Sequence, residues 1–341
     1  MLPHGSNNTI TDVEGVKVGH LSIQSGGHGG TDASSGSIRT GVTVILPHEN
    51  NIYRNNVAAS AHVLNGFGKS VGLLQVIELG RIESPIALTS TLNTWKIADS
   101  LIDYLSKHNP GIQSFNPIVG ECNDRYLNDA IGRHVQKEHL FEVIEKAYSP
   151  NTEEGNVGAG TGLTAFGWKG GIGTSSRICE SLQGLYDVGV LALCNTGDPR
   201  DLRIDGIKVG KHLTPPGVLD EAGGSIVFVI ATNAPLTARQ LQRMAKRAPI
   251  GLARVGGIIS HGSGTSAIAF SNSVERPQID DAHLTVLFRG VVEASEEAII
   301  NSILKSKTTI GRDGNTRHAI PIEKLQNILR GHENISVDTE R

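Results

Sequence analysis

The segment Ser225–Thr232, with the sequence SIVFVIAT, constrains the fold more than any other part of the chain. It is short, rich in β-branched residues and apolar on both alternating faces, a pattern typical of a buried central strand. Soon after it, Thr237 and Gln240 have the spacing of a capping box, which predicts the start of a helix. The apolar face of that predicted helix continues to Ala248.

The rest of the chain carries further strand and helix patterns in separate groups. The patterns predict short strands over 41–46 and 71–77, and helices over 94–107, 135–147, 295–304 and 321–331. Because strands and helices occur in runs and do not alternate strictly, the pattern favours an α+β fold over a doubly wound sheet. With no internal repeat and no linker of distinct composition, a single domain spanning residues 1–341 is expected.

Glycine makes up 41 of the 341 residues, well above its average share of about 7%, which predicts many tight turns and close backbone contacts. Two glycine-rich runs resemble phosphate-binding loops without matching them. The run 155–162 is spaced GxGxG where a dinucleotide loop needs GxGxxG, and the run 66–70 lacks the first glycine of a P-loop. We therefore expect glycine-rich turns and no nucleotide cofactor.

The charge pattern argues against several classes of partner. The net charge is −3 and no block of five like charges occurs, so neither nucleic acid nor an anionic membrane is an expected partner. The longest apolar run is about six residues, whereas a membrane span needs roughly 18. No secretory signal pattern begins the sequence, and the three scattered cysteines form no CxxC pair, so a cytoplasmic location is expected. The 13 histidines show no metal-ligand spacing, and no metal is expected.

A serine nucleophile is available only by an unusual route. No GxSxG motif lies at a strand-to-helix turn. A Ser at the start of a chain can use its own α-amine as the base, since that amine has a pKa of about 7.7–8.0. An internal Ser reaches this state if the preceding peptide bond is cut. Among the Gly-Ser bonds, only Gly224–Ser225 directly precedes a long buried strand. On these residues alone, an inert glycine turn remains the alternative.

Four ordered segments resemble the DmpA/BapA family of L-aminopeptidase/D-esterases and β-peptidyl aminopeptidases. They are Thr11–His20 (TDVEGVKVGH), Gly155–Gly162 (GNVGAGTG), Lys169–Arg177 (KGGIGTSSR) and Gly224–Ile226, within a similarity that extends from about residue 8 to 308. The resemblance implies an αββα sandwich of the kind found in N-terminal nucleophile hydrolases. It also implies cleavage into residues 1–224 and 225–341, with the cleaved heterodimers assembled into a homotetramer.

The resemblance also implies roles for particular residues. Ser225 is the expected nucleophile. The expected reaction removes the N-terminal residue of a small peptide or amino-acid amide through an acyl-enzyme on Ser225, and it needs no cofactor. Asn195 is expected to help form the oxyanion hole, and Ser263 to orient the freed amine. Tyr126 and Glu121 belong to the segment that contacts substrate in relatives. We assign Glu121 to the substrate ammonium group, with an ordinary surface carboxylate as the alternative.

One position departs from the family pattern. Thr265 stands where relatives commonly have Asp or Glu, so it offers a hydroxyl and no charge. A carboxylate there would favour a protonated amine. Thr265 therefore leaves open a binding protein that keeps the fold without turnover. An acyltransferase of the ornithine acetyltransferase type is a second alternative, because those enzymes share the sandwich and self-cleavage, but Ser225 argues against it since they use Thr. Cys194, next to Asn195, is interpreted as a small buried apolar residue.

Overall fold

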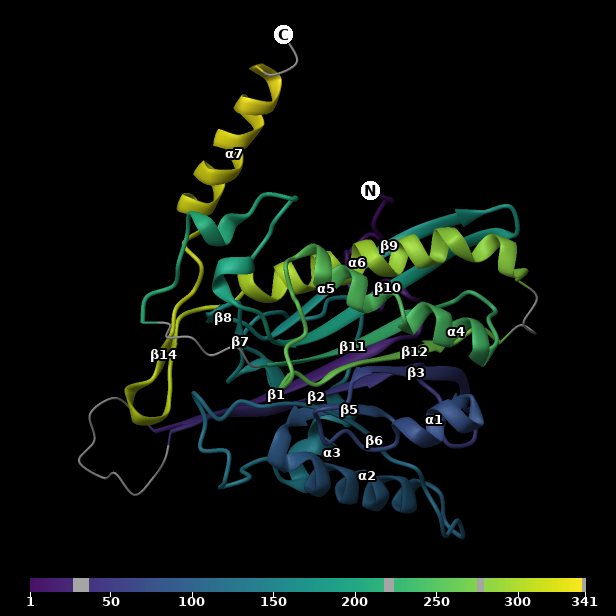
Figure 1. Ribbon diagram of the computed structural model, residues 1–341. Helices are drawn as coiled ribbons and strands as arrows, with labels where there is room; N and C mark the ends of the chain where they lie inside the picture. Colours follow the sequence, from purple (N-terminus) through teal and green to yellow (C-terminus); the bar gives the residue numbers. More distant parts are fainter. Residues whose placement is uncertain (27–36, 218–223, 275–278, 339–341) are drawn as a thin grey trace.

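Two β-sheets lie face to face between helices (Figure 1). The computed structural model describes residues 1–26, 37–217, 224–274 and 279–338. The four-stranded sheet has the order β1 (Lys17–Ser25), β2 (Ile38–Leu46), β5 (Ile86–Ser90), β6 (Ile118–Cys122). The six-stranded sheet has the order β4 (Arg81–Ile82), β3 (Val57–Asn65), β12 (Thr265–Ser271), β11 (Ser225–Thr232), β10 (Gly184–Asn195), β9 (Ile172–Ser181).

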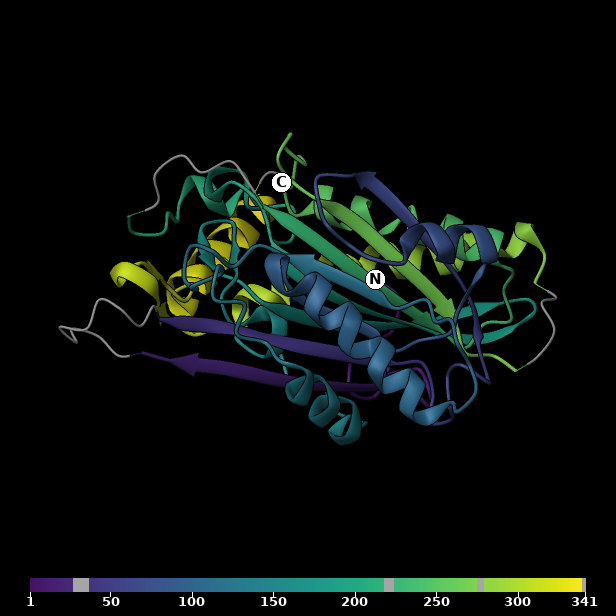
Figure 2. The same ribbon diagram turned by 90° about the horizontal axis from the view of Figure 1, so that it is seen from below.

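Helices cover the outer face of each sheet. Seen from below, α2 (Thr94–His108) and α3 (Lys137–Lys146) lie over the four-stranded sheet (Figure 2). The six-stranded sheet is covered by α4 (Ala238–Ala245) and α6 (Leu284–Leu304), and α5 (Ala248–Arg254) packs on α6. The order helix, sheet, sheet, helix confirms the predicted αββα, α+β fold.

Smaller elements complete the described chain. The helix α1 (Leu73–Leu79) packs on β3, and α7 (Ile322–Asp338) projects from the body in Figure 1. Two short hairpins are formed by β7 (Thr164–Ala165) with β8 (Trp168–Lys169), and by β13 (Thr309–Ile310) with β14 (Thr316–Arg317).

The strand β11 is the central buried strand that the sequence predicts. All eight of its residues are buried, and it pairs antiparallel with β10 and parallel with β12. Its side chains alternate between two cores. Ile226, Phe228 and Ile230 pack with the helices, whereas Val227 and Val229 pack between the two sheets. An apolar run without polar alternation is therefore needed, because both faces are removed from water.

The capping box that predicts α4 is confirmed. The backbone N–H of Gln240 donates to Thr237 Oγ1, and the backbone N–H of Thr237 donates to Gln240 Oε1 at 3.0 Å. The expected continuation to Ala248 is wrong, because α4 ends at Ala245 and α5 begins at Ala248. Pro249 lies at the start of α5, where its missing N–H does no harm, but it could not continue α4.

Three other expectations need correction. Residues 71–77 are not a strand, since α1 begins at Leu73 and buries Leu73 and Val76 three residues apart. The helix expected at 295–304 begins earlier, at Leu284, because buried residues continue its apolar side through Leu287 and Val291. The last helix runs past Gly331, where an added Cβ would meet no atom within 4 Å. A glycine inside an exposed helix costs only about 1 kcal/mol.

The glycine-rich run 155–162 is a tight turn, as expected. Residues Gly158–Gly160 form a single 3-10 turn beside the start of β9. A Cβ on Gly160 would lie 2.6 Å from the backbone nitrogen of Ile172, so the close approach of the two backbones requires glycine. Below this turn the fully buried Lys169 donates through Nζ to the carbonyl of Gly160 at 3.1 Å.

Candidate active site

A cleft of about 480 Å³ opens where β10 and β11 of one sheet and β6 of the other meet at the same end of the molecule. Segments that are far apart in the sequence line it. The lining residues include Phe67, Lys69, Thr91, Glu121, Asn123, Arg125, Tyr126, Thr164, Asn195, Gly224, Ser225, Gly262 and Arg317.

Ser225 is the first residue of β11 and lies opposite Asn195, the last residue of β10. Its side chain is 8% exposed, and Oγ accepts a hydrogen bond from the backbone N–H of Gly264 at 3.2 Å. The backbone N–H of Ile226 donates to the carbonyl of Gly264 at 2.8 Å, which aligns β11 with β12. The hydroxyl is therefore held at the end of a rigid strand, facing the cleft.

Gly224 precedes Ser225 at a position that only glycine can occupy. A Cβ there would collide with the carbonyl oxygen of Asn195 and lie 2.6 Å from Cα of Thr196. Gly224 also lines the cleft, so its peptide bond to Ser225 is accessible from the same space as the Ser225 hydroxyl.

Asn195 holds its side-chain amide in a fixed orientation through two backbone contacts. Its Oδ1 accepts from the N–H of Thr164, and its Nδ2 donates to the carbonyl of Asn123, each at 3.0 Å. An amide nitrogen carries two hydrogens, so one N–H of Nδ2 remains for an oxygen atom in the cleft. The amide is thus a preorganised donor next to Ser225.

Glu121, in β6, is the one carboxylate among the described residues that line the cleft, and it is 4% exposed. Its Oε1 accepts from the backbone N–H of Lys69 at 2.9 Å, and its Oε2 accepts from the hydroxyl of Thr91. Each carboxylate oxygen can accept more than one hydrogen bond. Glu121 can therefore bind an ammonium group while these two contacts keep it in place.

Tyr126 lies on the other side of the cleft, where its ring is covered by a guanidinium group. The Cζ of Arg317 lies 3.5 Å from the ring centroid, and Arg317 Nε donates to Thr164 Oγ1 at 3.1 Å. Arg317 is 5% exposed, so this cation–π contact is largely shielded from water. The contact fixes Tyr126 relative to the segment that also contacts Asn195.

Ser263 and Thr265 lie behind the nucleophile and not in the lining of the cleft. Each is 1% exposed, and neither hydroxyl has a hydrogen-bond partner within the described residues. Thr265 pairs with Ile226 in the parallel ladder, and Ser263 is anchored through its carbonyl, which accepts from Asn65 Nδ2 at 2.6 Å. Two buried hydroxyls beside the start of β11 are therefore left without an acceptor or donor.

Buried charges lie under the same end of the cleft. Asp124, which follows Asn123, and Lys169 are both buried, and desolvation raises the pKa of Asp124 to about 6 and lowers that of Lys169 to about 7. The Asp124 carboxylate partly offsets the effect on Lys169. Burial also raises the pKa of the Cys194 thiol to about 12, in agreement with its interpretation as an inert apolar residue.

The residues that the structure describes carry neither a metal cluster nor a membrane-spanning helix. Among them, no group of three or more His, Cys, Asp or Glu side chains has a geometry that could hold a metal ion. In the same part of the chain, no helix has the length and apolar character needed to cross a bilayer. All three cysteines are buried and unpaired.

The structure brings Ser225, Asn195, Tyr126 and Glu121 into one cleft with Gly224, and leaves Ser263 just behind it. The sequence gives no role to the other polar lining residues, which are Lys69, Thr91, Asn123, Arg125, Thr164, Thr196 and Arg317. Lys69 belongs to the run 66–70, which the sequence analysis examined only as a phosphate loop. Arg125 lies next to Tyr126, in the segment that the family resemblance already marks. No local pattern marks Thr164 or Arg317, which tertiary packing brings to the cleft.

Comparisons with known proteins agree with this geometry. The model of the family described as Peptidase family S58 matches residues 8–317. The beta-peptidyl aminopeptidase BapA of Sphingosinicella xenopeptidilytica is 38% identical, with 96% of this chain and 88% of that protein covered.

Two solved structures are similar over almost the whole chain. The PH0078 protein from Pyrococcus horikoshii OT3 has a TM-score of 0.91 and 47% identity, covering 98% of this chain and 96% of the other. The L-aminopeptidase D-Ala-esterase/amidase from Ochrobactrum anthropi has a TM-score of 0.88 and 30% identity, with 98% and 96% covered. The latter is described as a prototype serine aminopeptidase and a variant of the Ntn hydrolase fold.

Proposed function

From its sequence and fold this chain belongs to peptidase family S58, the serine aminopeptidases, and on that premise we propose that it cuts its own Gly224–Ser225 bond to become active. The cut chain then releases N-terminal residues from small peptides, amides or esters. The observation that carries the proposal is the meeting of Ser225, Asn195 and Glu121 in one cleft, at the start of a strand buried on both faces.

The self-cleavage step uses the Ser225 hydroxyl. Its Oγ attacks the carbonyl carbon of Gly224, the C–N bond breaks, and the hydroxyl proton passes to the departing nitrogen, which leaves an ester. Water then hydrolyses the ester to give the carboxylate of Gly224 and the free α-amine of Ser225. The contact between Gly224 and the Asn195 carbonyl supports this step, because glycine is the only residue that fits there.

The freed α-amine is the proposed base for turnover. An α-amine ordinarily has a pKa of about 7.7–8.0, which suits it to accept the Oγ proton as Oγ attacks the substrate carbonyl. The hydroxyls of Ser263 and Thr265 have no hydrogen-bond partner among the described residues, and Thr265 pairs with Ile226, the neighbour of Ser225. This supports our proposal that both position the freed amine. Thr265 carries no charge, so the amine keeps its neutral form to a lower pH than it would beside a carboxylate.

Asn195 and Glu121 are proposed to bind the two polar ends of the reacting residue. The free N–H of Asn195 Nδ2 donates to the oxyanion that develops on the carbonyl, while Glu121 binds the substrate ammonium group. We propose that Tyr126 contacts the substrate near the scissile bond, because its ring is held in the cleft by Arg317. Collapse of the tetrahedral intermediate gives an acyl-enzyme on Ser225, which water hydrolyses.

Mass spectrometry of the purified protein tests the proposal. Cleavage is expected to convert the 36.2 kDa chain into fragments of 224 and 117 residues, about 24 and 12 kDa, with Ser225 as the new N-terminus. Ser225→Ala should remain intact and inactive. Ser6→Ala is the matched control, because Ser6 also follows a glycine but lies exposed at the other end of the chain. An intact wild-type chain that still turns over aminoacyl anilides would contradict the proposal.

A substrate assay separates hydrolysis from acyl transfer. Wild-type protein is incubated with aminoacyl anilides and, separately, with N-acetylornithine. Consumption of the anilide and not of N-acetylornithine is expected. The reverse result would favour the acyltransferase alternative, and cleavage without turnover of either would favour a binding protein.

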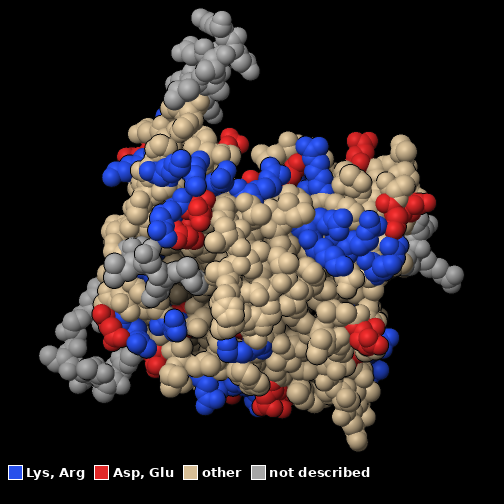
Figure 3. Space-filling view, viewed as in Figure 1, with Lys and Arg blue, Asp and Glu red and all other residues tan. Residues whose placement is uncertain are grey.

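We also propose that the cleaved heterodimers form a homotetramer. An apolar surface supports this proposal: Val63, Leu64, Leu74, Ile77 and Leu79, on β3 and α1, are all more than a third exposed. The middle of the face seen in Figure 3 carries few charged side chains. Light scattering measures the mass directly, and a mass of one chain would contradict the proposal.

A further inference from the structure

The charged side chains in the cleft are mostly cationic. Among the described residues, Lys69, Arg125 and Arg317 line it together with one carboxylate, Glu121. A site that recognises only an ammonium group has no need of the two exposed cations Lys69 and Arg125, which would repel such a substrate. The excess of positive charge therefore indicates a second, anionic group on the ligand.

The three cations are not equivalent. Arg317 is buried and has a structural role, because it stacks on Tyr126 and donates to Thr164. Lys69 and Arg125 are exposed, and within the described residues no hydrogen bond or ion pair is formed by their side-chain nitrogens. These two side chains are available to a ligand.

The charges also differ in depth. Glu121 is 4% exposed, whereas Lys69 and Arg125 are exposed at the mouth of the same cleft. The two loops that carry these cations are attached to the deeper site: the backbone N–H of Lys69 donates to Glu121, and Arg125 lies two residues after Asn123, which anchors Asn195. A ligand with its ammonium group at Glu121 therefore extends toward the two cations.

We propose that Lys69 and Arg125 bind a carboxylate on the part of the substrate that lies beyond the scissile bond. This inference rests on the proposed function and deepens it, since it specifies the substrate class as dipeptides or short peptides with a free carboxylate. Arg125 offers a planar pair of donors that matches a carboxylate, and Lys69 adds a mobile point charge. The carboxylate is the C-terminus of a short peptide or the acidic side chain of its second residue.

The test compares three substrates with the same N-terminal residue, alanyl or β-alanyl, whichever is released faster from its neutral p-nitroanilide. The first has leucine as its second residue and a free C-terminal carboxylate (the free acid). The second is the same dipeptide with a C-terminal amide (the leucine amide). The third has glutamate in place of leucine and a C-terminal amide (the glutamate amide). At low ionic strength, kcat/KM for the free acid is expected to exceed that for the leucine amide about tenfold, or about 1.4 kcal/mol. The ratio should decrease in high salt, because exposed charges are screened.

Variants of Lys69 and Arg125 test whether these two residues cause the preference for the free acid over the leucine amide. In the double variant Lys69→Gln/Arg125→Gln the ratio of free acid to amide should fall close to one, and Arg125→Glu should bring it below one. Arg54→Gln is the matched control, since Arg54 is exposed and does not line the cleft; its ratio should equal that of the wild type. If the double variant does not fold, each single variant should still lower the ratio.

The outcomes separate this inference from the function on which it rests. Fast turnover of the glutamate amide assigns the site to a side-chain carboxylate, and slow turnover assigns it to the C-terminus; both support the inference. Equal rates for all three substrates, or a ratio that survives in the double variant, would overturn it while leaving the aminopeptidase activity established. Absence of turnover of the p-nitroanilide would overturn the proposed function and this inference together.

Discussion

At the scale of single residues, the proposed chemistry of the cleft depends on three positions, each through one atom or one hydrogen bond. Gly224 has no space for a side chain, Asn195 has one free amide hydrogen, and the Ser225 hydroxyl is held by a single backbone donor. These features are local, so single substitutions test them.

Gly224→Ala is expected to block or strongly slow self-cleavage, because its methyl group would collide with the Asn195 carbonyl and displace the scissile bond. Denaturing gels over time would show a persistent 36.2 kDa chain. Gly331→Ala is the control, since an added Cβ there meets no atom, and it should be cleaved like the wild type. Cleavage of Gly224→Ala at the wild-type rate would show that the collision has no effect on the reaction.

Asn195→Asp keeps the oxygen that accepts from Thr164 but loses the Nδ2 donor. Loss of one oxyanion donor costs about 10²–10³ in kcat, or about 2.7–4 kcal/mol, so a decrease of that size is expected. The rate is measured with an aminoacyl anilide, on material whose cleavage and thermal unfolding have been checked. A kcat within threefold of the wild type would exclude Asn195 as an oxyanion donor.

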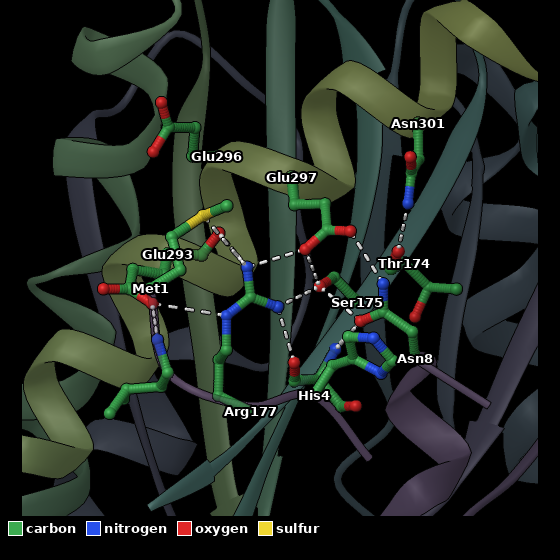
Figure 4. Close-up of polar contacts among 12 residues, drawn as sticks. Met1, His4, Asn8, Thr174, Ser175, Arg177, Glu293, Glu296, Glu297 and Asn301 are labelled. Carbon is green, nitrogen blue, oxygen red and sulfur yellow. Dashed lines mark hydrogen bonds and ion pairs between the residues drawn. The ribbon is translucent and has the colours of Figure 1, made fainter. Parts of the chain in front are cut away.

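At the scale of secondary-structure elements, buried polar contacts join strands to their neighbours. Arg177 on β9 is 2% exposed and lies between two carboxylates of α6 (Figure 4). Its Nη2 is 2.6 Å from Glu297 Oε2 and its Nε 3.4 Å from Glu293 Oε2. The backbone N–H of Leu2 also donates to Glu293, at 2.6 Å, so the start of the chain joins the same cluster.

Arg177→Met should lower the free energy of unfolding by about 3 kcal/mol, the lower end of the range for a broken buried pair, because Arg289 still contacts Glu293 and Glu297 is 32% exposed. Arg254→Met is the matched control. Its guanidinium, on α5, lies 2.7 Å from Glu296 of α6 but is 48% exposed. A loss of less than about 1 kcal/mol in the free energy of unfolding is therefore expected. Urea unfolding measures both, and equal losses would contradict the assignment of Arg177 as a buried tie between β9 and α6.

The pairing of β1 with β2 contains a histidine that makes stability depend on pH. His20 Nδ1 lies 2.8 Å from Thr43 Oγ1, and burial lowers the pKa of His20 from 6.5 to about 4. Because the folded pKa is the lower one, the stabilisation is complete above pH 6.5 and is lost as the pH falls through about 4. The expected loss is about 3 kcal/mol, at 1.36 kcal/mol for each pKa unit.

His20→Asn cannot take up the proton and should lose less stability between pH 6.5 and 4 than the wild type does. Urea unfolding at a series of pH values gives this difference. The exposed His4 provides the control, since His4→Asn should follow the wild-type curve. Parallel curves for His20→Asn and the wild type would show that His20 is not the group responsible.

At the scale of the whole molecule, the proposed cut divides the chain without dividing the fold. The bond lies just before β11, which stays between β10 of one fragment and β12 of its own fragment. The inter-sheet core and the helix-side core both contain residues from each fragment. The two fragments are therefore parts of one packed body.

Fragments 1–224 and 225–341 are expected to elute together in size-exclusion chromatography and to separate only in denaturant. Their apolar contact surface is the interior of the domain, which is buried as completely as any core. Detection of the fragments by mass in each peak makes the test direct. Elution of the smaller fragment alone from the native column would contradict the shared core.

Much of the fold follows from local patterns, and the errors have local causes. The buried strand β11, the capped start of α4 and the helix α2 are close to the predicted ranges, since each is specified by residues within a few positions of one another. The run 71–77 was misassigned because a short apolar run fits a strand or a helix equally well, and its contacts with β3 decide between them.

The family, the layered fold and the identity of the residues proposed for catalysis can all be inferred from the chain alone, because ordered motifs and short-range periodicity are properties of the chain. Only the tertiary structure decided that Lys69, Arg125 and Arg317 share a cleft with Ser225. Lys69 lies between β3 and α1, Arg125 follows β6 and Arg317 ends β14, and no local pattern relates residues more than fifty positions apart. Their meeting is set by which strands pair and how the two sheets pack, and burial of apolar surface drives that packing without encoding which polar side chains it will bring together.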